Sequence, residues 1–200
     1  RARVLSKILR EKEAVNFIAN FDLISGGSNE LLSKLLSGRL DFSLIGSVAP
    51  LVHPNLTVQA LDQREFYIFA SQDNPLSQKS EISFEEALDY PFILLEESFV
   101  HAKAFQNLKD KYQKDAKVLL HFSDVQTIGQ LVKSNIGITL MTDFLPFRDM
   151  ENLVKIPLAA KDKEIFYVQY AYLKTAVLNE DLQQLVAMLD KLAKVEDTLR

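Results

Sequence analysis

The feature that most limits the possible folds is the repeated alternation of short apolar strand patterns with helix patterns. Helical spacing predicts helices over 29–37, from Ser83 to before Pro91, through Ala104 to Tyr112, and from about Asp124. Short apolar runs predict strands over 41–47, 56–61, 65–71, 92–95, 118–122 and 136–141. Alternation of this kind is typical of mostly parallel sheets covered by helices. The sequence therefore predicts an α/β protein.

The two ends of the chain extend this pattern. Near the start, helical spacing of apolar residues over 4–9 is followed by strand-like alternation over 15–23. After strands at 153–158 and 165–171, Asn179 can cap a last helix. The stripe that this helix would bury consists of Leu182, Leu185, Val186, Leu189 and Leu192.

Two α/β series and a closing strand and helix must fit into 200 residues. The economical arrangement is two lobes joined by two crossing segments, with the C-terminal helix returning to the first lobe. We assign residues 1–63 and 164–200 to lobe I and 64–163 to lobe II. In open sheets of this class, ligands bind beyond the carboxyl ends of the strands, so we expect a ligand in a cleft between the lobes.

Small polar residues mark the junctions between strands and helices. Gly26 and Gly27 predict a tight turn, after which Ser28 or Asn29 can cap a helix. Asn135 tolerates the left-handed conformation that ends a helix. Capping-box spacing joins two further pairs, Ser83 with Glu86 and Ser123 with Gln126.

The charge balance argues against direct DNA binding by this stretch. Lys and Arg total 23 against 27 for Asp and Glu, which gives a net charge of −4. That is the wrong sign for a domain that neutralises phosphates.

The chain lacks both an apolar run of membrane-spanning length and the apolar core of a signal peptide, so we expect a cytoplasmic protein. The chain does not begin with Met, and its first residues already lie within a pattern of helical spacing. We therefore expect that further residues precede Arg1.

The residues that carry most enzyme chemistry are missing. The chain has no Cys, and its three His residues lie far apart without metal-ligand spacing. Glu96 and Glu97 are adjacent rather than facing; we interpret them as loop charges, with contact to a ligand as the alternative. The GxSxG, P-loop and GxGxxG motifs are absent. We therefore predict no catalytic activity, no metal and no cofactor.

Two strand-to-helix junctions remain as candidate ligand sites, one in each predicted lobe. They span 26–29 and 122–127. Backbone N–H groups at the start of a helix can bind an anion. The alternative is that both junctions are only turns and caps.

The order and spacing of four segments is the most specific signal in the chain. They are GGSNELLSKLLSGRLDFSLIG (26–46), DNPLS (73–77), SFEEALDYPFILLEE (83–97) and SDVQTIGQLVKSNIGITLM (123–141). Together they resemble the effector-binding domain of LysR-type transcriptional regulators. The resemblance implies a bilobal, periplasmic-binding-protein-like (type II) fold with two mixed, mostly parallel sheets flanked by helices. It further implies a small-molecule effector, a homodimer or tetramer, and DNA binding through a winged helix-turn-helix before Arg1.

The resemblance also implies a set of ligand-binding residues. Matching positions give Gly27, Ser28, Ser47, Val48, Phe122, Ser123, Thr127 and Thr139. No arginine lies clearly among them, so strong charge pairing with a dicarboxylate is not indicated.

The chain departs from the family pattern in several places. Family members usually open this domain with a strand that adds a hydroxyl to the pocket, and no such strand precedes Val4. Asn74 stands where a His is common, Asn135 where a Gly ends the helix, and Thr142 where a Pro often follows the strand.

We therefore expect the ligand-sensing domain of a LysR-type regulator. The alternative is a solute-binding protein of a transport system with the same fold. An enzyme on this fold is a third reading, for which the chain shows no reactive residue.

Overall fold

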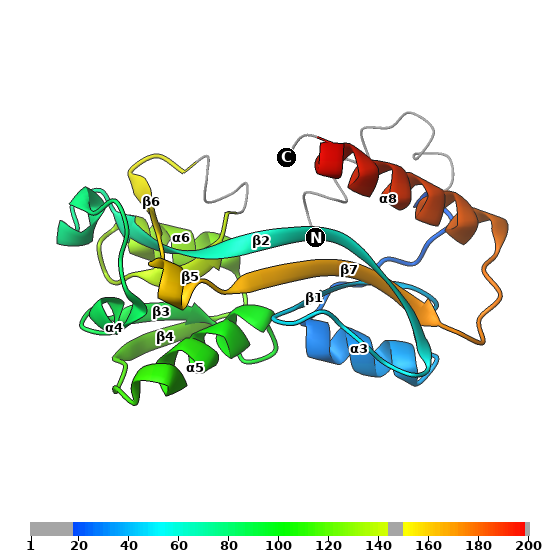
Figure 1. The fold of residues 1–200 in the computed structure, drawn as a ribbon, viewed down its shortest axis with the longest axis horizontal. Helices are drawn as coiled ribbons and strands as arrows, with labels where there is room; N and C mark the ends of the chain where they lie inside the picture. The colour runs from blue at the N-terminus through cyan, green and yellow to red at the C-terminus, as the bar shows by residue number, and fades with distance from the viewer. Residues whose placement is uncertain (1–17, 144–149, 199–200) are drawn as a thin grey trace. The chain divides into compact units, whose positions relative to one another are not determined.

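The computed structural model describes residues 18–143 and 150–198. The chain forms two compact units: unit 1 holds the residues up to Gln63 and from Tyr167 onward, and unit 2 holds Arg64–Phe166. Two long strands, β2 (Leu56–Ser71) and β7 (Ile165–Leu173), each carry the chain from one unit into the other (Figure 1). The helix expected at 4–9 lies outside the described residues.

In the described residues of unit 1, two helices and a short strand pack with the ends of these long strands. It contains α3 (Ser28–Leu36), β1 (Ser43–Ser47) and α8 (Glu180–Thr198). Strand β1 pairs antiparallel with β7, with Ser43 opposite Ala171. The buried side chains of Leu35, Ile45, Leu56 and Ala171 form a cluster that joins α3 to the strands. Helical spacing predicts a stripe of Leu31, Leu32, Leu35 and Leu36; of these, Leu31 and Leu35 are buried, Leu32 is partly buried and Leu36 is 37% exposed.

Helix α8 begins where the sequence predicts. Asn179 Oδ1 accepts the Leu182 N–H at 2.9 Å, and Leu182 and Leu189 are buried. The Tyr170 hydroxyl donates to Asp190 at 2.9 Å, which ties the helix to β7.

Unit 2 contains the second α/β series. Its elements are η1 (Pro75–Gln78), α4 (Phe84–Ala87), β3 (Phe92–Leu95), α5 (Val100–Tyr112), β4 (Val118–Phe122), α6 (Val125–Lys133), β5 (Thr139–Thr142), β6 (Leu153–Pro157) and η2 (Ala160–Asp162). Strands β3 and β4 pair in parallel, while β5 and β6 each pair antiparallel with β2.

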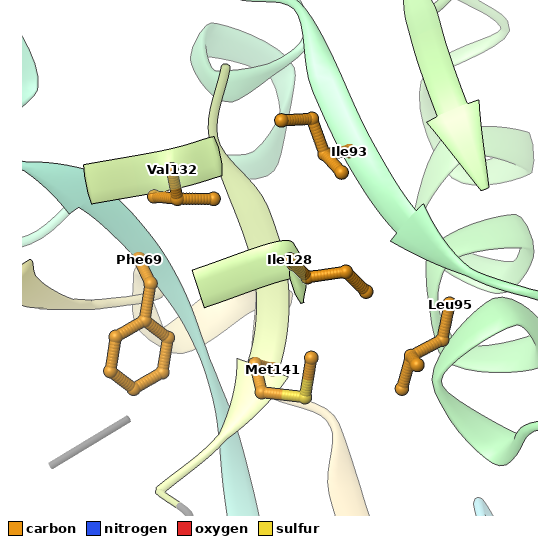
Figure 2. Packing of buried hydrophobic residues seen from close by; sticks show 6 residues of the cluster. All are labelled: Phe69, Ile93, Leu95, Ile128, Val132 and Met141. Atoms are coloured by element: carbon orange, nitrogen blue, oxygen red, sulfur yellow. The ribbon is translucent and has the colours of Figure 1, made fainter. Parts of the chain in front are cut away.

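The core of unit 2 joins α6 to both sheets. Ile128 and Val132 of α6 pack with Phe69, Ile93, Leu95 and Met141, which come from β2, β3 and β5. Figure 2 shows Ile128 and Val132 between Phe69 on one side and the two β3 residues on the other. All six side chains are at most 2% exposed. This packing fixes α6 against the strands, and with it the junction that precedes α6.

The α/β class is confirmed, but strand pairing differs from the sequence-based expectation. Parallel pairing occurs between β3 and β4, which α5 connects, and in the isolated bridges Phe92–Ile138 and Ile82–Leu158. The described registers β1–β7, β2–β5 and β2–β6 are antiparallel. The paired strands are distant in sequence, so whether they run parallel or antiparallel depends on the direction in which the chain returns to the sheet. The spacing of apolar residues along a single strand does not contain this information.

Three local predictions were wrong. Residues 56–61 and 65–71 form the single strand β2, because the polar residues between them lie within a hydrogen-bonded strand. Residues 18–23 form no strand: the Phe21 N–H donates to the Ile18 carbonyl in a turn. The cap of α6 is Asp124, whose carboxylate accepts the N–H groups of Gln126 and Thr127, and not Ser123. The Ser83 cap is confirmed, because its Oγ accepts the Glu86 N–H at 3.2 Å.

Two departures from the family pattern are in contact with each other. Asn135 ends α6 with a φ of 58°, the left-handed conformation expected from sequence. Asn74 Nδ2 donates to Asn135 Oδ1 at 3.1 Å, while Asn74 Oδ1 accepts the Leu76 N–H that starts η1. The two side chains therefore connect the end of α6 to the turn after β2.

A buried carboxylate holds three separate segments of unit 2 together. Asp162 is 1% exposed and accepts the Phe84 N–H at 2.7 Å, the Lys111 ammonium at 3.0 Å and the Tyr112 hydroxyl. Burial would raise the pKa of Asp162, but the hydrogen bonds from Tyr112, Phe84 and Lys111 outweigh it and hold the pKa below its ordinary value. The charged form is therefore the one that stabilises the fold.

We predict that Asp162→Asn lowers the free energy of unfolding by about 2–3 kcal/mol, because it replaces charge-assisted hydrogen bonds at a buried site. Urea unfolding at pH 7 measures the change. Since the pKa of Asp162 is depressed in the folded state, its contribution is present above the unfolded-state pKa and is lost as the pH falls. Asp110→Asn, on the exposed side of α5, is the control. An equal loss in both variants would contradict the prediction.

Candidate functional site

The first predicted junction lies in unit 1 at the start of α3. Gly27 is the N-cap residue and offers no side-chain cap hydrogen bond. Ser28, which we expected to be a possible cap, is the first helical residue and is only 8% exposed. Its Oγ accepts the Gly46 N–H of β1 at 3.1 Å. The hydroxyl thus fastens the helix start to the end of β1.

The same end of β1 carries Ser47 and Val48, which are both half-buried. Ser47 Oγ accepts a hydrogen bond from Gln169 Nε2 at 2.8 Å and donates to the Ala49 carbonyl. Gln169 Oε1 also accepts the Leu51 N–H at 2.6 Å. Gln169 of β7, which the sequence reasoning missed, therefore shapes the loop after β1. No local pattern identifies it, because it is a polar residue in an apolar strand.

The second predicted junction lies in unit 2, where β4 ends beside β3. Phe122 is opposite Leu95 in the parallel pair and packs against the core cluster of Figure 2. Ser123 is exposed, and Thr127 is half-buried in the first turn of α6. These three residues are close in sequence and surround one helix start.

That helix start is already occupied by an acidic side chain. Asp124 Oδ2 accepts the Thr127 N–H at 2.9 Å and the Thr127 hydroxyl at 2.6 Å, and Asp124 Oδ1 accepts the Gln126 N–H. These bonds lower the pKa of Asp124, the Thr127 hydroxyl contributing most. A carboxylate here satisfies the positive end of the α6 dipole and would repel an anionic ligand. The expected anion site at this junction is therefore filled by the protein itself.

Thr139 differs from the other candidate residues. It is fully buried in β5, opposite Phe69, and its hydroxyl has no hydrogen-bond partner within 18–143 and 150–198. A buried hydroxyl without a partner costs folding free energy.

The candidate residues thus fall into two groups. Gly27, Ser28, Ser47 and Val48 lie together in unit 1, held by Gly46 and Gln169. Phe122, Ser123 and Thr127 lie together in unit 2, with Thr139 buried in a strand of the same unit.

His101, one of the three histidines without metal-ligand spacing, lies in the first turn of α5. Its ring packs against Phe66 and Phe166, with ring centroids 5.4 and 5.5 Å away. Both ring nitrogens are buried and neither has a hydrogen-bond partner. Burial lowers the pKa of His101 to about 4, so the ring is neutral at pH 7.

The described residues contain no group of His, Cys, Asp and Glu side chains that could hold a metal ion. Nor does any helix within 18–143 and 150–198 have the length and apolarity needed to cross a membrane.

Comparison with known proteins identifies relatives across nearly the whole chain. Residues 2–194 match the model of the LysR substrate binding domain. A malolactic fermentation system transcriptional activator from Lactococcus lactis is 40% identical over 94% of this chain and 65% of its own length. An uncharacterized HTH-type transcriptional regulator from Bacillus subtilis, YybE, is 27% identical over 68% of this chain and 46% of its own length. The chain thus spans less than two thirds of either curated relative.

Solved structures show the same fold. The regulatory domain of CcmR from Synechocystis, solved in complex with 2-PG, has a TM-score of 0.76 at 18% identity and covers 96% of this chain and 90% of its own. The effector binding domain of QuiR, in complex with shikimate, has a TM-score of 0.70 at 15% identity and covers 93% and 90%. The periplasmic-binding-protein-like fold expected from sequence is confirmed.

We predict that protonation of His101 destabilises the fold. Its pKa is lower in the folded chain than its ordinary value of about 6.5, so the unfolded chain binds the proton first. The free energy of unfolding should therefore fall by about 3 kcal/mol as the pH drops from 7.5 to 4. Urea unfolding across this range measures it. His101→Phe should remove this component of the pH dependence, whereas His121→Gln, at an exposed position, should retain it. Identical pH profiles for wild type and His101→Phe would contradict the assignment.

Proposed function

We propose that this chain, which belongs to the LysR substrate binding domain family, senses a small organic acid on behalf of a DNA-binding transcriptional regulator. The observation that carries this proposal is the family match over residues 2–194, together with 40% identity to a transcriptional activator. Because that activator is longer than the region matched here, DNA binding is assigned to a part of the protein outside this chain. A cytoplasmic location follows from the same proposal, since the regulator must reach DNA.

The proposed class of effector follows from the relatives and from unit 1. The name of the Lactococcus lactis activator points to malate and lactate, and the QuiR structure holds shikimate, a hydroxylated carboxylic acid. In unit 1, the N-cap residue of α3 is Gly27, which has no capping side chain, and Glu30 lies in the first turn, so backbone N–H groups rather than a cation would contact the effector there. The start of α6 is less suitable because Asp124 occupies it.

The proposed contacts of the effector include both groups of residues. Unit 1 contributes hydrogen-bonding groups, and unit 2 contributes an aromatic side chain and hydroxyls. They are Gly27, Ser28, Ser47, Val48, Phe122, Ser123, Thr127 and Thr139. We propose that the effector is bound and released unchanged, without a metal or another cofactor, and that binding shifts the regulator between two states of different activity.

A solute-binding protein of a transport system is the alternative function for this fold. It is less favoured, because both curated relatives are named as transcriptional regulators. For the same reason an enzyme is not proposed.

We further propose that the chain forms a homo-oligomer through β4. Leu119 and Leu120 of this strand are 38% and 43% exposed, and in the described part of the chain β4 pairs only with β3. An apolar strand with a free edge is suited to pairing with a second copy.

An acid effector should stabilise the chain against unfolding. At one hundred times the dissociation constant, the free energy of unfolding should rise by about 2.7 kcal/mol. Thermal and urea unfolding with malate, lactate, shikimate and glucose measure this, glucose being the uncharged control. Thr127→Val should weaken binding by about 1–3 kcal/mol if the hydroxyl contacts the effector. Absence of stabilisation by every acid would contradict the proposal. Conversion of a bound acid, detected by mass spectrometry, would favour an enzyme instead.

Leu120→Lys should weaken self-association at least tenfold, because it places a charge on the proposed apolar contact. Sedimentation velocity over a range of protein concentrations measures the dissociation constant. Val177→Lys is the control, because Val177 is 96% exposed and lies outside β4. A wild-type chain that stays monomeric at high concentration would contradict the oligomer. An unchanged dissociation constant for Leu120→Lys would contradict the use of β4.

A further inference from the structure

Three aromatic rings meet where the first turn of α5 lies against both of the long strands. The ring of His101 packs against Phe66 of β2 and Phe166 of β7, with ring centroids 5.4 and 5.5 Å away. The centroids of the two phenylalanine rings are 6.0 Å apart, and the ring planes meet at 82°. Unit 2 runs from Arg64 to Phe166. Helix α5 therefore contacts both strands close to the points where they leave this unit.

A histidine side chain at this position is energetically unfavourable. Both ring nitrogens are buried, and among the residues that the structure describes neither nitrogen has a hydrogen-bond partner. A neutral imidazole has one N–H to donate and one lone pair to accept, so the packed conformation leaves one donor and one acceptor unsatisfied. Unsatisfied polar groups lower the stability of the conformation that buries them. An apolar side chain carries no such cost.

The first turn of α5 is also weakly held by hydrogen bonds. Its N-cap residue, Phe99, supplies no side-chain hydrogen bond, and the first N–H groups of a helix have no acceptor within the helix. The backbone bonds that the structure describes there are local: the Phe99 N–H donates to the Glu96 carbonyl at 3.0 Å, and the Ala102 N–H donates to the Phe99 carbonyl at 3.1 Å. This turn can therefore move without breaking the regular hydrogen bonds of the rest of α5.

We propose that the first turn of α5 is a release point with two conformations. In the described conformation the His101 ring packs against Phe66 and Phe166. In a minor conformation the ring leaves the two phenylalanines, and its nitrogens form hydrogen bonds with water. Because the unpaired nitrogens destabilise the packed conformation, the difference in free energy between the two is small enough for both to be populated. Minor conformations of this kind typically have populations of about 0.1–10%.

The release point deepens the proposed function, and its regulatory role rests on that function. Phe99, at the start of α5, packs against the same buried cluster as Phe122, one of the proposed effector contacts. An effector that contacts Phe122 is thus connected, through the cluster of Figure 2, to the turn that contacts β2 and β7. Since both strands continue into unit 1, an effector that favours one conformation of this turn changes how unit 2 holds them.

Relaxation-dispersion NMR of the 200-residue chain without effector tests the inference, because it detects minor conformations that exchange within microseconds to milliseconds. In the wild type, the backbone amides of Phe66, Val100, His101 and Phe166 should show exchange. His101→Leu and His101→Phe should each lower the population of the minor conformation by about tenfold or more, since neither side chain gains hydrogen bonds on entering water. The imidazole nitrogens of wild-type His101 should show the same exchange, and that measurement needs no variant.

The control is His121→Gln, at an exposed position of β4, which should leave the exchange unchanged. Absence of exchange at the four amides and at the imidazole of the wild type would contradict the inference. Undiminished exchange in both variants would contradict it as well, because the motion would then be independent of the imidazole.

The two variants also separate polarity from size, and urea unfolding verifies that each one folds. Loss of exchange in His101→Phe, with full exchange in folded His101→Leu, would attribute the populations to ring size and overturn the inference. Because the experiment contains no effector, its failure leaves the proposed function standing. That function fails instead when none of the acids binds.

Discussion

The constraint on which the rest of the fold depends is the continuity of β2. Its first residue, Leu56, is buried in the cluster of unit 1, whereas its second half pairs with β5 and β6 in unit 2. One hydrogen-bonded strand of 16 residues therefore takes part in the sheets of both units. A shift in its register by one residue would turn every side chain to the opposite face, and over 68–71 both faces are already filled, because these four consecutive residues are all buried. The side chains of Phe66, Ile68 and Phe69, each at most 2% exposed, oppose such a shift.

Buried polar side chains then determine the loops that the apolar core leaves undefined. Asp162 joins η2 to the start of α4 and the end of α5, and Gln169 joins β7 to the loop after β1. Asn74 and Asn135 join the turn after β2 to the end of α6. Each of these groups is satisfied by a backbone or side-chain partner that is distant in sequence. Apolar contacts tolerate small displacements, whereas hydrogen bonds of this kind require specific geometry, so these residues fix the positions of the loops.

The two candidate junctions differ in electrostatics although their sequences look alike. Both place small polar residues at the start of a helix, and the sequence alone suggests an anion at either one. In the structure, the carboxylate of Asp124 caps α6, whereas the N-cap residue of α3 is Gly27 and the first turn of α3 carries Glu30. His101 adds a buried neutral imidazole to unit 2, next to Phe66 and Phe166.

Local patterns along the chain are enough to identify the α/β class, most helix positions and the family. Helix stripes such as that of α3 and caps such as Ser83 and Asn179 are local patterns, and local patterns depend on residues three or four positions apart. The antiparallel pairing of β2 with β5 and β6 is visible in the three-dimensional structure but not in the sequence patterns, since that pairing joins residues far apart in the chain. The same holds for the donors and acceptors around Ser47. These depend on Gln169, which lies 122 residues further along the chain and reaches Ser47 because β1 and β7 pair.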